Sequence, residues 1–98
     1  MPQFPNWSRL IHYLELEDPT VLLPSTQGVY KLYWITKSNR VLQYIGETVD
    51  LRRRLGHGHF HKNWWNHCQY SETKGYRESQ RKDLEHSLIS RHQPRYND

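Results

Sequence analysis

Two short runs of alternating β-branched and aromatic residues constrain the fold of this chain most strongly. Residues 28–35 read GVYKLYWI and residues 41–46 read VLQYIG, a composition typical of β-strands. Residues 37–40 between them, KSNR, contain the polar residues that favour a turn. The pattern predicts an antiparallel hairpin that brings Tyr30 and Tyr44 onto neighbouring strands.

The rest of the chain predicts a small α+β domain. Helical spacing of apolar residues and a following proline predict a long helix over residues 78–92. Residues 68–71 are either a third strand or a wide loop. Three strands are about the minimum for a stable isolated sheet, so we expect a three-stranded antiparallel sheet flanked by helices. The other predicted helical segments are an N-terminal helix at 6–17, a short helix at 48–55 and a helical turn within 60–67.

The charge is unevenly distributed along the 98 residues. The net charge is +4, but residues 1–26 carry −2 and residues 27–98 carry +6. We therefore divide the chain into an N-terminal helix and connector, 1–26, and a working domain, 27–98. A basic body favours a polyanionic partner such as nucleic acid, although the same charge also serves solubility.

Several classes of protein are excluded at this stage. The apolar runs are too short to span a bilayer, and the N-terminus has no apolar signal-peptide core. A single cysteine, Cys68, cannot form an internal disulfide. We expect an intracellular, cytoplasmic protein with no membrane partner, either a monomer or a homodimer.

Glu85 stands out on the C-terminal helix. At about 100° per residue, it falls inside the apolar arc defined by Leu84, Leu88 and Ile89. A carboxylate that faces a core is costly unless it is paired or binds a cation. The alternatives to a cation site are a buried ion pair with an arginine, or a helix rotated enough to expose the carboxylate.

An arginine run, Arg52, Arg53 and Arg54, follows the hairpin. Leu51 and Leu55 define the buried side of this short helix, so Arg53 points away from it and the other two flank it. Such runs are usually solvated. A flanking arginine can nevertheless bring its guanidinium to the edge of the core, and this group suits bidentate contact with a phosphate.

The strand tyrosines allow two interpretations. Strict alternation places Leu42, Tyr44 and Gly46 on one face of the second strand, beside Tyr30 on the first. Cross-strand core packing is the default role of such tyrosines. A buried hydroxyl still needs a hydrogen-bond partner, so two hydroxyls, an arginine and a glutamate on one face would form a polar site.

Taken in order, these residues resemble the GIY-YIG nuclease superfamily, over about residues 27–97. Gly28-Val29-Tyr30 and Tyr44-Ile45-Gly46 match the two tripeptides, with fourteen residues from Tyr30 to Tyr44. Arg54 follows ten residues later, then Leu84-Glu85 and a Pro94-Arg95-Tyr96-Asn97 ending. The resemblance implies a metal-dependent endonuclease that hydrolyses phosphodiester bonds in nucleic acid, with DNA as the expected substrate.

The resemblance also implies a role for each matching residue. Tyr30 and Tyr44 match the two family tyrosines, one of which is expected to help activate the attacking water. Arg54 matches the arginine that holds the scissile phosphate, with Arg53 as the fallback. Glu85 matches the carboxylate that binds Mg²⁺ or Mn²⁺, and Asn97 the asparagine that supports the site. The residues expected to contact substrate are Arg52, Arg53, His57, His59 and Lys62.

The chain departs from the family pattern at two positions. Many relatives have a histidine four residues after the arginine, where this chain has Gly58 between His57 and His59. Glu47 follows the second tripeptide, where some relatives carry a basic or small residue. Its carboxylate would either weaken contact with nucleic acid or add a second metal ligand.

Two other functions remain open. The first is a nucleic-acid-binding module of the same fold without catalysis. The second is a zinc-stabilised domain, for which the candidate ligands are His57, His59, His61, His67 and Cys68. Trp64 and Trp65 either stack on unpaired bases or, as is more usual, pack over the sheet.

Overall fold

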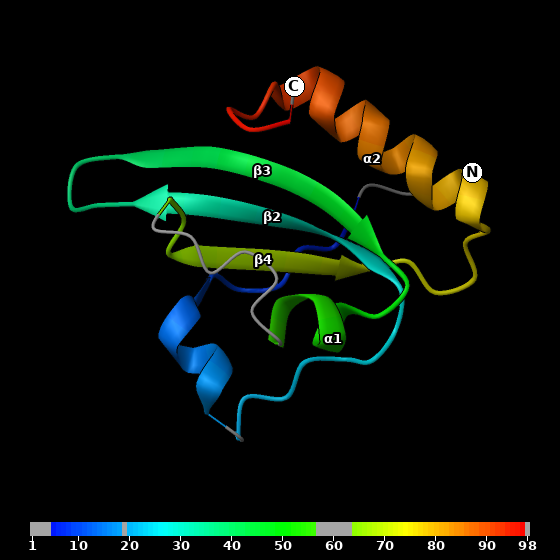
Figure 1. The fold of residues 1–98 in the computed structure, drawn as a ribbon. Helices are drawn as coiled ribbons and strands as arrows, with labels where there is room; N and C mark the ends of the chain where they lie inside the picture. The colour runs from blue at the N-terminus through cyan, green and yellow to red at the C-terminus, as the bar shows by residue number, and fades with distance from the viewer. Residues whose placement is uncertain (1–4, 19, 57–63, 98) are drawn as a thin grey trace.

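The computed structural model describes residues 5–18, 20–56 and 64–97, and its architecture confirms the α+β class (Figure 1). Its elements, in chain order, are β1 (Ile11–His12), the 3-10 helix η1 (Tyr13–Glu17), β2 (Gly28–Ile35), β3 (Arg40–Thr48), α1 (Leu51–Gly56), β4 (His67–Glu72) and α2 (Glu78–His92). The predicted ranges of β2 and α2 agree with the structure. The third strand predicted at 68–71 is β4, so the alternative of a wide loop is excluded.

The strands form one antiparallel sheet in the order β1-β4-β2-β3. Strand β2 is central, and its Tyr30 lies opposite Gly46 on β3 and Tyr70 on β4. Strand β3 is at the edge of the sheet, so one side of its backbone is available to other parts of the chain. This arrangement decides where the candidate site forms.

The N-terminal segment differs from the predicted helix over 6–17, and the sheet gains a fourth strand. Ile11 pairs with Cys68 of β4, and the Ser8 amide donates to the Tyr70 carbonyl over 2.8 Å. Only Tyr13–Glu17 is helical, as η1. The open edge of β4 supplies main-chain partners to residues 8–12, and this tertiary pairing overrides the helical spacing of the apolar residues.

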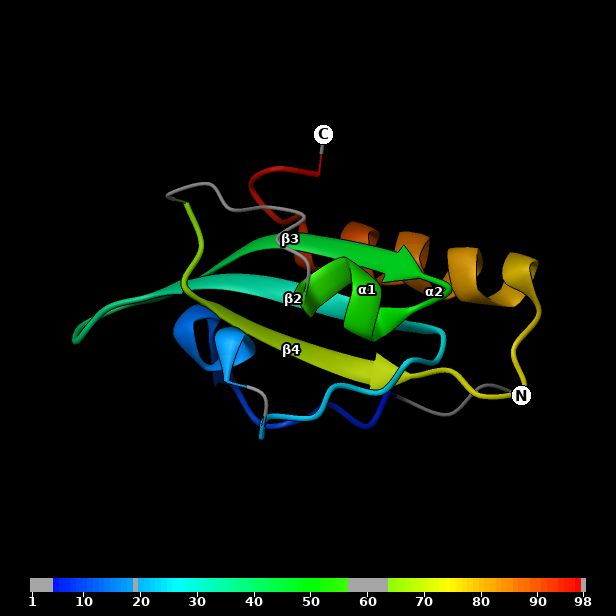
Figure 2. The same ribbon diagram turned by 60° about the horizontal axis from the view of Figure 1, so that its bottom comes forward.

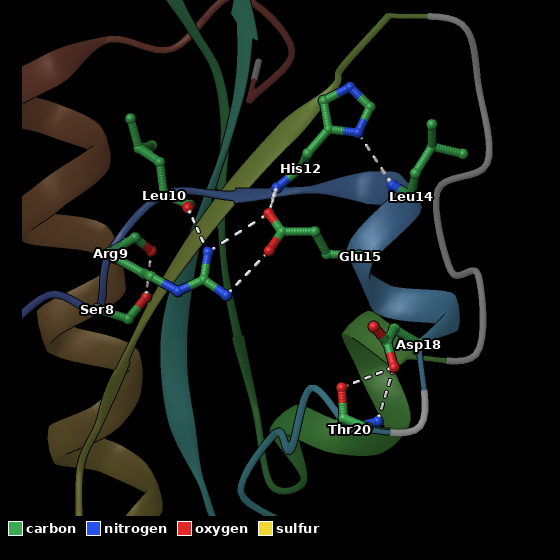
Figure 3. A network of polar contacts seen from close by, with 8 residues as sticks. All are labelled: Ser8, Arg9, Leu10, His12, Leu14, Glu15, Asp18 and Thr20. Atoms are coloured by element: carbon green, nitrogen blue, oxygen red, sulfur yellow. Dashed lines mark hydrogen bonds and ion pairs between the residues drawn. The ribbon is translucent and has the colours of Figure 1, made fainter.

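Side chains of this segment fix the junction between β1 and η1 (Figure 3). The His12 ring accepts a hydrogen bond from the Leu14 amide at Nδ1, and Glu15 accepts one from the His12 amide over 2.8 Å. Arg9 donates to Glu15 over 3.0 Å. Glu15 therefore closes the turn between β1 and η1. Its negative charge is paired with Arg9 of the same N-terminal segment.

A β-bulge changes the expected face of Leu42. Leu32 pairs with Tyr44, but the next residue, Tyr33, pairs with Leu42, so one residue of β3 is left extra. Leu42 consequently packs with the cluster on the α2 side of the sheet, whereas Tyr44 packs on the opposite side. Strict alternation is therefore wrong for Leu42, and Tyr44 keeps the face predicted for it.

The two helices cover opposite faces of the sheet (Figure 2). One core gathers around α1 and η1 and includes Tyr30, Leu32, Leu51, Leu55 and Trp65. The other lies under α2 and is built on Val29, Ile45 and Leu88. Within the described parts of the chain, no helix is long and apolar enough to cross a membrane.

Candidate active site

Tyr30 and Tyr44 lie side by side on the α1 face of the sheet, as predicted. Their ring centroids are 6.1 Å apart at an interplanar angle of 35°. Tyr30 is 1% exposed, and its burial, followed by the neighbouring Tyr44, raises its pKa well above the ordinary value of a phenol. Tyr44 is half-buried. Burial and the Glu85 charge raise its pKa, while Arg54 and a hydrogen bond from Tyr30 lower it. Both phenols are therefore protonated at neutral pH.

Gly46 makes room for the Tyr30 phenol. A Cβ built on Gly46 would overlap the Cζ of Tyr30 and lie 2.5 Å from its hydroxyl oxygen. The ring therefore lies directly across the edge strand. The charges of Glu85 and Glu47 raise the pKa of its hydroxyl, which places both carboxylates within electrostatic range of it.

Glu85 approaches the tyrosines from α2, the helix on the other face. Its side chain is 18% exposed. Burial, followed by the nearby carboxylate of Glu47, raises its pKa above the ordinary value. Its charge in turn raises the pKa of both Tyr30 and Tyr44. The carboxylate thus lies at the β3 edge, where an acid and two phenols meet.

The structure separates the three arginines by their surroundings. The charge of Arg54, which is half-buried, lowers the pKa of both tyrosines. Arg52 donates from Nε to the Leu23 carbonyl over 2.8 Å and so holds the connector that precedes β2. Arg53 is exposed. Arg54 is therefore the arginine that the fold brings to the tyrosine pair, which favours it over the fallback assignment.

All three arginines line a pocket of about 800 Å³. The other described lining residues are Ser25, Thr48, Val49 and Asp50. Asp50 is committed to helix α1, because its carboxylate accepts a hydrogen bond from the Arg53 amide over 3.1 Å. The guanidinium groups make this hollow a favourable place for an anion.

Asn97 is fixed to the outer edge of β3. Its amide oxygen accepts from the Ile45 amide over 2.7 Å, and its amide nitrogen donates to the Ile45 carbonyl over 2.8 Å. Ile45 lies between Tyr44 and Gly46, so Asn97 holds the backbone that carries both. Gln93 follows the last residue of α2 with a left-handed backbone conformation, φ 46°. The chain turns at this residue, so that residues 94–97 return to the edge of β3.

An ion pair that sequence reasoning missed lies next to Glu85. Arg81 of α2, whose side chain is 6% exposed, donates to Glu47 over 2.7 Å and to the Gln27 side chain over 2.6 Å. The acidic partner of the buried Arg81 is thus Glu47 rather than Glu85. The carboxylate of Glu85 instead lies 3.8 Å from Nε2 of His86. Arg81 is four residues before Glu85 and seven before Leu88, a spacing that predicts the same buried face.

Other candidate residues are placed as follows. Residues His57, His59, His61 and Lys62 lie outside the described residues. Cys68 is buried in the core, whereas its neighbour His67 points to the other face of β4, where it contacts His12. These two cannot share one zinc ion. Among the described residues, no three potential metal-ligating side chains gather in one place.

The two tryptophans separate into a core and a surface role. Trp65 is buried in the α1-side core, which is the packing role considered for it. Trp64 is half-buried between the rings of Tyr44 and Tyr96.

Comparisons of the chain with protein-family models, curated proteins and solved structures gave no significant match.

Proposed function

We propose that this protein is a divalent-metal-dependent endonuclease of the GIY-YIG type that hydrolyses phosphodiester bonds in nucleic acid, with DNA as the expected substrate. The observation that carries the proposal is the convergence of four groups from four elements. Tyr30 of β2 and Tyr44 of β3 lie side by side, and the charges of Arg54 of α1 and Glu85 of α2 act on the pKa of both, Arg54 lowering it and Glu85 raising it. A purely structural core does not require this mixture of phenols and opposite charges.

The residues present fit a hard divalent cation. Glu85 offers a carboxylate whose side chain is 18% exposed and whose pKa is raised by burial and by Glu47, while His86, Lys82 and a backbone hydrogen bond at Glu47 lower it. A bound cation would favour its charged form. Mg²⁺ prefers oxygen ligands and keeps several of its waters, so one protein carboxylate suffices. When bound at Glu85, Mg²⁺ or Mn²⁺ would supply charge stabilisation for the leaving oxygen. Glu47 is the nearest second carboxylate, but one of its oxygens is held by Arg81.

The protein groups divide the remaining work. Arg54 neutralises a non-bridging phosphate oxygen, where charge develops during displacement. Tyr44 is the more accessible phenol, and it receives a hydrogen bond from the buried Tyr30. Because both phenols are protonated at neutral pH, neither can accept the proton of the attacking water. They therefore act by orienting that water, and its proton leaves to bulk solvent. Asn97 keeps the Tyr44–Gly46 backbone in place.

The path of the substrate strand follows from charge. Arg54 lines the same pocket as Arg52 and Arg53, and its charge also lowers the pKa of Tyr44. A phosphodiester backbone that enters this pocket brings one phosphate to Arg54 while neighbouring phosphates meet the exposed Arg53. The net +6 of residues 27–98 supports the same partner through long-range attraction.

The test is cleavage of end-labelled single-stranded, duplex, flapped and branched DNA, and of RNA, with Mg²⁺, with Mn²⁺ and with chelator. We expect cleavage of at least one DNA substrate that requires the metal and disappears with chelator. Binding without cleavage under every condition would contradict the proposal and indicate the binding module instead. Cleavage that survives chelation would contradict the role given to Glu85.

A further inference from the structure

A series of aromatic rings leads from the tyrosine pair to the surface. The Tyr44 and Trp64 centroids are 6.3 Å apart at 66°, and those of Trp64 and Tyr96 are 4.6 Å apart at 50°. Tyr96, the last ring, is 46% exposed. Because Trp64 already covers Tyr44, the exposed face of Tyr96 is not needed to complete the core.

The backbone of this outer pair is anchored to the edge strand beside the site. The Tyr96 amide donates to the Gln43 carbonyl over 2.8 Å, and the Gln43 side chain donates to the Trp64 carbonyl over 2.9 Å. Asn97 is fixed to Ile45 by its two hydrogen bonds. Both rings are therefore held at positions next to Tyr44. A ligand that stacks on them pays little conformational entropy to order the surface.

A cation accompanies the exposed ring. The guanidinium of Arg95, which is itself exposed, lies over the Tyr96 ring at 5.6 Å from its centroid, so this exposed side chain and the ring present a cation and an aromatic face together. An exposed aromatic face with an adjacent arginine matches the two parts of a nucleotide, a flat base and an anionic phosphate. Bases within a duplex are stacked and paired, so this surface is complementary only to a base that is unpaired.

We propose that Tyr96, backed by Trp64 and flanked by Arg95, is a stacking subsite for an unpaired nucleobase next to the cleaved phosphate. The substrate class is therefore nucleic acid with a single-stranded segment at the site. This inference rests on the proposed function, because it assigns the substrate form to the same site.

The experiment measures binding in chelator, so that its result does not depend on cleavage. Affinities of the full chain for a labelled oligothymidylate of about twelve nucleotides and for a mixed-sequence duplex are compared for wild type, Tyr96→Leu and Tyr96→Phe. Trp34→Leu is the matched control, since Trp34 is 38% exposed and lies opposite Val41 near the turn between β2 and β3. A thermal melt of each variant reports its folding.

We expect Tyr96→Leu to weaken single-strand binding at least about fivefold, since base–aromatic stacking has this scale. Duplex binding by Tyr96→Leu should change less than about twofold, and so should single-strand binding by Tyr96→Phe and Trp34→Leu. Wild-type affinity of Tyr96→Leu for the oligothymidylate would overturn the inference, as would an equal loss for both ligands.

A second measurement covers the case in which Tyr96→Leu fails to fold. Oligothymidylate should quench the tryptophan fluorescence of the wild type, and Trp64→Phe, which keeps a ring at this position, should lose a large part of that quenching. Unchanged quenching in Trp64→Phe would overturn the inference. Absence of cleavage by the wild type with Mg²⁺ would instead contradict the proposed function and leave these binding results intact.

Discussion

The phenol ring of Tyr30 occupies the space above Gly46 that the side chain of any other residue would fill. The overlap of a built Cβ with the ring carbon Cζ makes this contact specific to glycine. Gly46 lies directly opposite Tyr30 in the sheet register. The second tripeptide therefore has a structural reason to end in glycine, namely the passage of the first tripeptide's tyrosine across the edge strand.

Gly46→Ala should damage both folding and activity. The new methyl group meets a buried ring that has little room to move, and overpacking of this kind typically costs about 1–3 kcal/mol of unfolding free energy. Displacement of the Tyr30 hydroxyl should also lower cleavage. Gly56→Ala is the control, because among the described residues its Cβ would meet only the Leu23 side chain, at 3.7 Å. Equal stability and activity of both variants and wild type would contradict this contact.

Tyr30→Phe and Tyr44→Phe should each reduce cleavage at least about a hundredfold, the usual cost of a misplaced reacting group. Both changes delete the hydrogen bond between the two hydroxyls, and Tyr44→Phe also removes the more accessible phenol, so we expect Tyr44→Phe to be the more damaging. Each change should alter stability by only about 1 kcal/mol, the net contribution of one hydrogen bond. Single-turnover rates and thermal melts separate the two effects.

Tyr33→Phe is the matched control for the tyrosines. Tyr33 lies on the opposite face of β2, and its hydroxyl donates to the Gln69 side chain over 3.1 Å. Its loss should cost a similar amount of stability and leave cleavage unchanged. Normal cleavage by Tyr30→Phe and Tyr44→Phe together with failure of Tyr33→Phe would place the active face on the other side of the sheet.

Glu85→Gln should abolish cleavage without unfolding the domain. The raised pKa of Glu85 shows that burial disfavours its charged form, so neutral glutamine should be tolerated. Activity at a tenth of the wild-type level or more would contradict the metal-ligand role.

The pH dependence of stability gives an independent check on Glu85 in metal-free buffer. Because the pKa of Glu85 is higher in the folded than in the unfolded state, the folded protein binds a proton first as pH falls. Wild type should therefore gain stability relative to Glu85→Gln as pH falls from neutral to about 4.5, the ordinary value. The melting-temperature difference should stay constant below that pH, and a difference of opposite slope would contradict the burial of this carboxylate.

Arg54→Ala should remove most turnover while nucleic-acid binding survives, because the Arg54 contact strengthens as charge develops on the phosphate. Arg53→Ala should cleave with a nearly normal maximal rate, bind modestly more weakly, and lose about one phosphate contact from the salt dependence of binding. Binding titrations at several salt concentrations and single-turnover rates make the comparison. An inactive Arg53→Ala with a mildly affected Arg54→Ala would reverse the two assignments.

Local sequence determines much of the framework. Alternating β-branched and aromatic residues predict β2 in full, and the apolar spacing with Pro94 predicts α2, because both patterns reflect which side chains face a core. The same reasoning places Glu85 at the border of a buried face and Tyr30 beside Tyr44. The catalytic roles, which come from the resemblance, stay predictions until activity is measured.

Contacts between distant segments are decided only by the tertiary structure. The spacing of Ile11 and Leu14 is compatible with a helix, but the unpaired edge of β4 offers main-chain hydrogen bonds to residues 8–12. Local pattern also does not predict the bulge that turns Leu42 away from Tyr44. Nor does it relate the residues joined by the Arg81–Glu47 ion pair and by the contact of Asn97 with Ile45. Periodicity specifies which face a side chain takes, whereas the pairing of an open strand edge or a buried charge depends on which partner the folded chain brings within reach.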